Sequence, residues 1–266
     1  MKYLKLQDGA QMAYMDKGID RSNPPIVFLH GFPADHSMWK NQIDELSVRR
    51  RVIVPDLRGF GQSPLGEGPH PMETHVDDVL FLLDALGVSH AVLVGLSMGG
   101  YVALRALEKT PDRFSKIVLM DTQSPADSDG AKLKRHEAME NIRSKGARAF
   151  AEKFAEGAFA PDTWRTRPPW VESFVTGIAA LPAANLRAGL FSLLSRTDTT
   201  SILSRIRVPT LGIVGEHDRI TPPDVMRAMT GQIAGGMLSI IPKAGHFPPL
   251  ENPDALNPIL EEFIAP

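Results

Sequence analysis

The stretch Gly95–Gly100 constrains the fold of this chain more than any other part of the sequence. It lies between an apolar run typical of a buried strand (91–94) and a helix-forming run (101–109). A strand that turns into a helix over so few residues strains the backbone of the central Ser97. Glycines two positions before and after it let the strand and the helix approach closely. We therefore predict a nucleophile elbow, a strand–turn–helix unit that presents the Ser97 hydroxyl above a sheet.

Apolar runs alternate with helix-forming segments on both sides of this unit. Further strands are predicted over 1–6, 10–15, 26–29, 51–55, 116–121, 210–214 and 237–241. Helices are predicted over 38–46, 73–86, 223–232 and 254–263. Parallel strands are joined by crossover helices, so this alternation predicts an α/β fold with a mostly parallel, doubly wound sheet.

The alternation stops between residues 122 and 200, where no convincing strand run occurs. Helices are expected there over 131–145, 147–158, 170–179 and 183–195, with prolines between them. No Ser/Gly tract flanks this block, so a flexible interdomain linker is not expected. We therefore predict one core domain, built from residues 1–121 and 201–266, with residues 122–200 inserted as a helical cap.

The charge and composition exclude several classes of protein. The 266 residues include 29 Lys and Arg against 31 Asp and Glu, which predicts neither a nucleic acid nor an anionic membrane as a partner. The chain has no cysteine, which excludes disulfides, thiolate metal sites and a cysteine nucleophile. No apolar run approaches the ~20 residues that span a bilayer, and the first residues lack the apolar core of a signal peptide. We therefore expect a cytoplasmic protein.

Neither a metal nor a cofactor is predicted. The sequence has no His-x-x-x-His pair and no local acidic cluster of the kind that binds metal ions. Gly59-x-Gly61 lacks the complete glycine fingerprint of a dinucleotide site. The expected partner is therefore a small-molecule substrate.

Five short motifs occur in an order that resembles the α/β-hydrolase family. They are His30-Gly31-Phe32-Pro33, Asp56-x-Arg58-Gly59-x-Gly61-x-Ser63, Gly95-x-Ser97-x-Gly99-Gly100, Gly215-x-x-Asp218-x-x-x-Pro222 and Gly245-His246-x-x-x-x-Glu251-x-Pro253. The resemblance covers nearly the whole chain and implies the eight-stranded α/β-hydrolase sheet. Among members, the chain looks most similar to small bacterial carboxylesterases and to 3-oxoadipate enol-lactonases.

The resemblance implies a catalytic triad. Ser97 would be the nucleophile, and it needs a base because a serine hydroxyl is protonated at neutral pH. His246 would be that base, and Asp218 would be the acid that holds its tautomer. Asp121 also follows a predicted strand and is the competing acid, since some members carry their acid there.

The resemblance also implies an oxyanion hole made by two backbone N–H groups, those of Phe32 and Met98. Four side chains are candidates for the substrate pocket: Trp39, Phe32, Met98 and Trp164. Packing in the core is the alternative for Met98 and Trp39. The Asp56–Ser63 motif is expected to be a structural loop.

The resemblance implies hydrolysis of small to medium carboxylic esters through an acyl-enzyme, without metal or cofactor. A serine at position 97 disfavours the dehalogenases and epoxide hydrolases of the same fold, which use a carboxylate there. Hydrolysis of an enol-lactone or other lactone, or cofactor-free perhydrolase activity, could use the same triad. A hydrolase-fold ligand receptor with little turnover is the alternative from another class, because fold does not settle function. A monomer or a homodimer is expected.

Overall fold

The computed structural model describes residues 1–18 and 23–265. Within these residues the strands form one eight-stranded sheet in the order β1-β2-β4-β3-β5-β6-β7-β8. The strands are β1 (Lys2–Lys5), β2 (Gln11–Lys17), β3 (Ile26–Leu29), β4 (Val52–Pro55), β5 (Ala91–Leu96), β6 (Phe114–Met120), β7 (Thr210–Gly215) and β8 (Met237–Ile241). The first two form an antiparallel hairpin, β2 pairs antiparallel with β4, and all later pairs are parallel. The predicted mostly parallel α/β sheet is confirmed.

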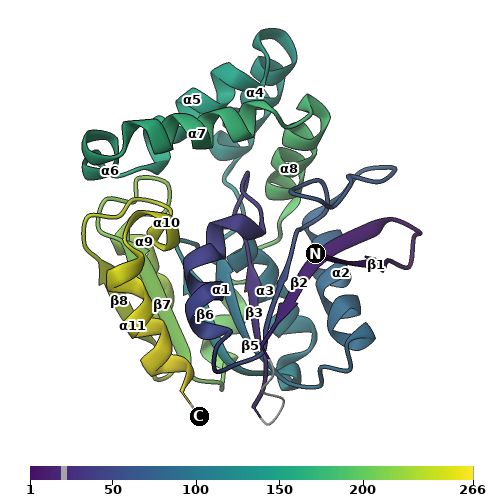
Figure 1. Cartoon of the computed structure of the whole chain (residues 1–266), viewed down its shortest axis with the longest axis vertical. Helices are drawn as coiled ribbons and strands as arrows, with labels where there is room; N and C mark the ends of the chain where they lie inside the picture. Colours follow the sequence, from purple (N-terminus) through teal and green to yellow (C-terminus); the bar gives the residue numbers. More distant parts are fainter. Residues whose placement is uncertain (19–22, 266) are drawn as a thin grey trace.

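Helices cover both faces of this sheet (Figure 1). They are α1 (Lys40–Leu46), α2 (Met72–Ala85), α3 (Met98–Lys109), α9 (Pro223–Thr230) and α11 (Pro253–Ile264), with the short η1 (His36–Trp39), η2 (Pro111–Arg113), η3 (Thr200–Arg205) and α10 (Pro248–Glu251). Helix α1 packs beside α11, and α2 packs beside α3. Every residue of β3, β4, β5 and β7 is therefore buried, as their continuous apolar runs require.

Five helices follow one another between β6 and β7, a stretch that the structure describes without a gap and that contains no strand. They are α4 (Asp129–Lys145), α5 (Ala147–Ala158), α6 (Pro161–Thr166), α7 (Pro168–Ala179) and α8 (Ala183–Ser195). We call residues 129–195 the cap, because its helices lie over one end of the sheet (Figure 1). Two of these helices begin with a proline at the first position, where a missing N–H costs no hydrogen bond.

No single described helix is long and apolar enough to cross a membrane. Helices α7 and α8 reach that length and composition only as a pair, and the pair is bent by 93°.

An aromatic cluster joins the cap to the core. Phe159 is fully buried, and its ring centroid lies 5.1 Å from Trp170, 4.9 Å from Phe174 and 5.8 Å from Phe247. The first two of these partners belong to α7, whereas Phe247 follows β8 in the core. Aromatic rings bury large apolar areas and favour such tilted and edge-on contacts. The cap is therefore held on the core by a continuous apolar contact.

Candidate active site

The sheet gathers the predicted site residues at one edge. Strands β3, β5, β6, β7 and β8 are consecutive parallel neighbours, so their carboxyl ends meet there. Leu29 pairs with Gly95, and Leu96 pairs with Met120, so the ends of β3, β5 and β6 are level. The residues that follow these five ends are His30–Pro33, Ser97, Asp121, Asp218 and His246. Functional groups of open α/β sheets collect at this edge.

Ser97 occupies the strained turn that the sequence predicts. Its backbone has φ 51° and ψ −111°, and it directly precedes the first residue of α3. A β-carbon on Gly95 would lie 2.3 Å from the carbonyl oxygen of Gly99, and one on Gly99 would lie 2.2 Å from the carbonyl oxygen of Leu29. Both positions therefore require glycine, because any side chain would collide with backbone.

Neighbouring backbone holds this turn in place. The Ser97 N–H donates to the Met120 carbonyl at 2.8 Å, and the Ser97 carbonyl accepts from Thr122 Oγ1 at 2.9 Å. Both partners lie at or just beyond the end of β6. The backbone of Ser97 keeps its strained φ of 51° because these hydrogen bonds hold the turn in a single conformation.

Asp218 and His246 form a buried pair. Nδ1 of His246 lies 2.9 Å from Oδ2 of Asp218. The carboxylate also accepts from Thr221 Oγ1 at 2.7 Å and from the N–H groups of Ile220 and Thr221 at 2.8 and 3.1 Å. Burial acts to raise the pKa of Asp218, but the charge and hydrogen bond of His246 and the other donors lower it below its ordinary value. Asp218 is therefore an ionised, firmly oriented acceptor for the imidazole.

Asp121 lies beside this pair but is bonded differently. Its Oδ1 accepts from the Gly215 N–H at 2.8 Å, while Oδ2 is buried and makes no hydrogen bond within the described residues. Burial, followed by the negative charge of Asp218, raises the pKa of Asp121 well above its ordinary value. The pKa of Asp121 is therefore shifted toward the neutral acid, whereas that of Asp218 is shifted toward the carboxylate.

The loop after β3 lies directly against Ser97. A β-carbon on Gly31 would lie 3.3 Å from the Ser97 β-carbon, and a turn closed by Ala34 N–H and the Gly31 carbonyl (2.9 Å) shapes the loop around Phe32. The N–H groups of Phe32 and Met98 donate no hydrogen bond to any described residue. Since a buried N–H without a partner is rare, both groups are free for an acceptor that enters the site.

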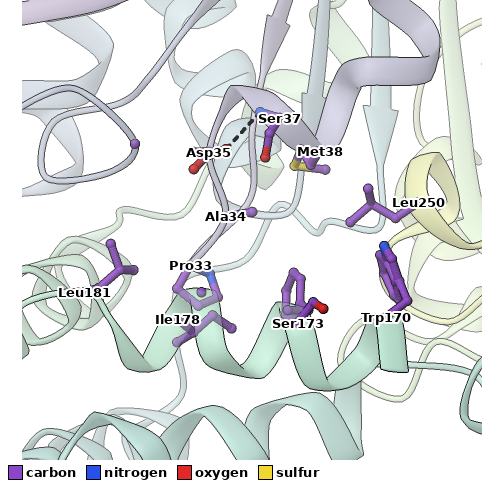
Figure 2. A pocket seen from close by; sticks show the side chains of 13 residues that line it. Pro33, Ala34, Asp35, Ser37, Met38, Trp170, Ser173, Ile178, Leu181 and Leu250 are labelled. Atoms are coloured by element: carbon purple, nitrogen blue, oxygen red, sulfur yellow. Dashed lines mark hydrogen bonds between the residues drawn. The ribbon is translucent and has the colours of Figure 1, made fainter. Parts of the chain in front are cut away.

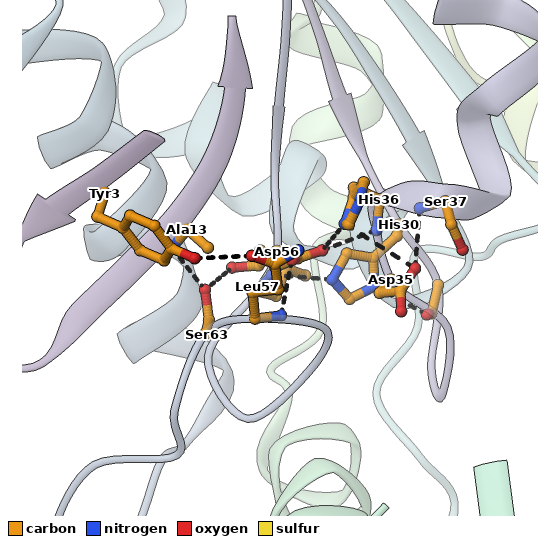
Figure 3. Close-up of polar contacts among 11 residues, drawn as sticks. Tyr3, Ala13, His30, Asp35, His36, Ser37, Asp56, Leu57 and Ser63 are labelled. Atoms are coloured by element: carbon orange, nitrogen blue, oxygen red, sulfur yellow. Dashed lines mark hydrogen bonds and ion pairs between the residues drawn. The ribbon is translucent and has the colours of Figure 1, made fainter. Parts of the chain in front are cut away.

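His30 connects this loop to the loop after β4 (Figure 3). Its Nε2 lies 2.8 Å from the Leu57 N–H, so Nε2 accepts and the proton must sit on Nδ1, which donates to the Gly31 carbonyl at 3.0 Å. Burial lowers the pKa of His30, which keeps the ring neutral for this arrangement. The predicted structural loop after β4 thus supports the loop that carries Phe32.

Sequence reasoning did not find a second His–Asp pair, between His36 and Asp56 (Figure 3). Nδ1 of His36 lies 2.7 Å from Oδ1 of Asp56, which also accepts from the His36 N–H at 2.8 Å. The other oxygen of the fully buried Asp56 accepts from the Gln62 N–H at 2.9 Å. The hydrogen bond to Asp56 raises the pKa of His36. Residues 20 positions apart are joined here only by the fold, so no local sequence signal marks the pair.

Two of the candidate pocket residues, Trp39 and Trp164, are not among the residues that line the cleft described below. Trp39 is fully buried at 4.8 Å from the Phe28 ring, so it belongs to the core beneath the loop and not to a pocket wall. Trp164 is 37% exposed on α6 and makes none of the aromatic contacts of the cap–core cluster within the described residues. Of the other two candidates, the Met98 side chain is fully buried and the Phe32 ring packs edge-on against Phe60 and Phe154.

A cleft of about 330 Å³ opens between the cap and the loop after β3 (Figure 2). Helix α7 contributes one wall, including Trp170, Phe174 and Ile178, and the loop contributes Pro33 and Ala34. None of the described residues that line it is a lysine or an arginine, and Asp35 is its one acidic residue. Ser37 and Ser173 add polar groups to the lining, and neither Ser97 nor His246 is among the residues that line it.

The fold also creates two groups of three potential metal ligands, Asp35–His36–Asp56 and Asp121–Asp218–His246, with ligand atoms within 4.8 Å of one another. In each group the imidazole Nδ1 already hydrogen-bonds a carboxylate, at 2.7 Å and 2.9 Å. Hydrogen bonding is therefore sufficient to explain why these side chains lie together.

Comparison with known proteins agrees with this geometry. Residues 24–253 match the family described as alpha/beta hydrolase fold. A thermophilic esterase from Thermogutta terrifontis, solved with malate bound, is 36% identical and superposes with a TM-score of 0.93, over 99% of this chain and 98% of that one. The 3-oxoadipate enol-lactonase 2 of Acinetobacter baylyi is 28% identical over 90% of this chain and 87% of its own length. A bifunctional esterase/perhydrolase of Acinetobacter calcoaceticus is 28% identical over 99% of both chains.

Proposed function

The chain belongs to the alpha/beta hydrolase fold family, and from that premise we propose that it is a serine hydrolase of small to medium carboxylic esters. The observation that carries the proposal is the buried 2.9 Å hydrogen bond between Asp218 and His246, at the strand ends where Ser97 also lies. An imidazole held by an ionised carboxylate is suited to take a proton from a serine hydroxyl.

In the proposed reaction Ser97 Oγ attacks the acyl carbonyl carbon, and its proton passes to Nε2 of His246. The negative charge that develops on the carbonyl oxygen is stabilised by the N–H groups of Phe32 and Met98. His246 then gives its proton to the leaving alkoxide, which departs as the alcohol. A water that loses a proton to His246 attacks the acyl-enzyme, the carboxylic acid leaves, and Ser97 regains its proton.

The acid in this scheme is Asp218. Nδ1 of His246 is hydrogen-bonded to it, and the ionised carboxylate stabilises the imidazolium that forms during the reaction. Asp121 is less suited to this role, because no hydrogen bond joins it to the imidazole among the described residues and its raised pKa favours the neutral acid.

Substrate class is proposed from the relatives. An esterase and an esterase/perhydrolase are among the similar proteins, which supports an uncharged ester as the substrate. The relative named 3-oxoadipate enol-lactonase makes a lactone the second candidate. The esterase is the more similar of the two, at 36% against 28% identity. We therefore place esters first.

A chromogenic ester series tests this proposal. The wild type and Ser97→Ala are compared on p-nitrophenyl esters of increasing acyl length and on an enol-lactone. We expect turnover of short to medium esters by the wild type and its loss in Ser97→Ala. Equal rates in the two proteins would remove Ser97 as the nucleophile. A single stoichiometric release of p-nitrophenol would indicate a receptor, and faster lactone hydrolysis would indicate a lactonase.

A further inference from the structure

A buried carboxylate that the proposed reaction does not use lies next to the loop of His246. This carboxylate is Glu251. Its side chain forms no ion pair with any described residue and instead accepts four hydrogen bonds. Its Oε1 accepts from the N–H groups of Gly245 and Phe247, the two neighbours of the proposed base, at 2.9 and 3.1 Å. Its Oε2 accepts from the Ala160 N–H at 2.8 Å and from Thr163 Oγ1 at 2.7 Å.

The two oxygens therefore bind two different parts of the molecule. Gly245 and Phe247 belong to the core loop after β8, whereas Ala160 and Thr163 belong to the cap, between the end of α5 and the middle of α6. The contacts with the cap therefore span 88 and 91 positions of sequence.

Further contacts join the same two segments. The His246 N–H donates to the Ala158 carbonyl at 2.6 Å. A β-carbon on Gly245 would lie 2.4 Å from that same carbonyl oxygen, so the loop and the cap touch backbone to backbone. The Arg167 guanidinium, at the start of α7, donates to the carbonyls of Leu250 and Glu251. The loop of His246 is thus bonded to the cap on both sides of the imidazole.

The chemistry at Glu251 requires a carboxylate. Four N–H and O–H donors converge on its two oxygens, and the side chain is only 6% exposed. A glutamine of the same size would turn an NH₂ group toward one pair of donors and leave them without an acceptor. Buried donors without partners are costly, so either the cap side or the loop side would move away.

We propose that Glu251 is a positioning residue that fixes the loop of His246 to the cap, so that cap residues 158–163 help to orient the base. This inference rests on the proposed function, in which His246 is the general base. A displacement of about 1 Å in a reacting group can cost on the order of 10²-fold in rate, so a loosened loop has a large effect on turnover.

The test compares Glu251→Gln with the matched control Glu262→Gln, which alters an exposed glutamate on α11. Ester turnover and hydrogen exchange by mass spectrometry are measured on both. For Glu251→Gln we expect kcat to fall on the order of 10²-fold with a much smaller change in KM, and faster exchange in segments 158–163 and 245–247. The control should match the wild type in both measurements. A folded Glu251→Gln protein with wild-type kcat would overturn the proposal, even with faster exchange.

A second pair of variants applies if Glu251→Gln does not fold. Thr163→Val removes one cap donor, and Thr163→Ser keeps the hydroxyl. We expect kcat to fall in Thr163→Val and to return in Thr163→Ser, whereas wild-type kcat in Thr163→Val would overturn the proposal. Failure of the proposed function is recognised separately, because the wild type would then turn over no ester or would do so equally well as Ser97→Ala.

Discussion

At the scale of single residues, the pKa values of two aspartates that follow neighbouring strands are shifted in opposite directions, because burial raises that of Asp121 whereas His246 and other donors lower that of Asp218. Asp218 accepts bonds from Thr221, Ile220 and the imidazole, which together stabilise its charge. Asp121 accepts one bond, from Gly215, and faces the charge of Asp218. Two carboxyl groups held close together in a buried site separate into one ionised and one neutral group, because both cannot carry charge at low cost.

This difference predicts unequal effects on turnover. Asp218→Asn should lower kcat on the order of 10⁴-fold, because an amide neither holds the imidazole tautomer nor stabilises its charge. Asp121→Asn should keep activity close to that of the wild type, because an amide resembles the neutral acid that it replaces. Steady-state kinetics on one p-nitrophenyl ester measures both. The opposite order of the two variants would transfer the role of the acid to Asp121.

Asp121→Asn should also change how stability depends on pH. The pKa of Asp121 is raised in the folded protein above its ordinary value of 3.8, so its favourable contribution to folding is complete below that value and is lost as pH rises through the folded pKa. Asparagine does not titrate. The free energy of unfolding of Asp121→Asn, relative to the wild type, should therefore increase from pH 4 upward in urea titrations. A difference independent of pH would show that Asp121 is ionised in the folded protein.

At the scale of elements, the loops at the strand ends hold one another in place. The loop after β3 and the loop after β4 are joined by His30 to Leu57 and by His36 to Asp56. The second of these contacts includes a charge when His36 is protonated, and the hydrogen bond to Asp56 raises the pKa of His36 above its ordinary value of 6.5. The segment that carries Phe32 is therefore supported by a histidine whose pKa is raised above its ordinary value.

Replacement of His36 by asparagine tests this support. His36→Asn keeps a donor near the position of Nδ1 but removes the titration. The stabilising contribution of His36 is fully present below pH 6.5 and is lost as pH rises through the raised pKa. The wild type should therefore lose its advantage in unfolding free energy over His36→Asn as pH rises above 6.5, measured by denaturant unfolding across pH 5.5 to 9. An advantage that stays constant across this range would mean that no charge contributes to the contact.

At the scale of the whole molecule, the cap and the core share one apolar interior. Phe159 sits at the centre of it, between Trp170 and Phe174 of α7 and Phe247 of the core. The same part of the cap holds the loop of His246 through Ala158, Ala160 and Thr163. Phe159, which stabilises the cap–core contact, is thus adjacent in sequence to Ala158 and Ala160, which hold the loop of the proposed base.

Truncation of Phe159 should therefore destabilise the whole protein. Phe159→Ala removes a fully buried ring and should lower the free energy of unfolding by about 3–5 kcal/mol. Phe191→Ala, which truncates a ring on α8 that is 36% exposed, should cost much less. Urea unfolding followed by tryptophan fluorescence compares the two. Equal losses would show that Phe159 does not have the central place in packing that its contacts imply.

The order of elements could be predicted from the sequence because each depends on local periodicity or local turn chemistry. The buried strands, the Ser97 turn and the helical character of the cap were all read from neighbouring residues. The short helices α6, α10, η2 and η3 escaped prediction, because three to six residues contain too few turns to show a helical period. Trp39 had two readings, core packing and a pocket wall, and only the structure decides for packing, since a helix-forming pattern does not state what packs against a side chain.

What the sequence by itself determined is therefore the sheet, the strained serine turn and the set of residue types available at the strand ends. Only the tertiary structure decided which of them form hydrogen bonds with one another. The imidazole of His246 is bonded to Asp218 rather than to Asp121, and His36 is bonded to Asp56. Glu251 is bonded both to the loop of His246 and to the cap. The pairs Asp218–His246 and His36–Asp56 are 28 and 20 positions apart, and Glu251 lies 88 and 91 positions from its two cap partners. Their partners are selected by burial and by the direction of donors and acceptors in space, and neither quantity is a property of a short stretch of sequence.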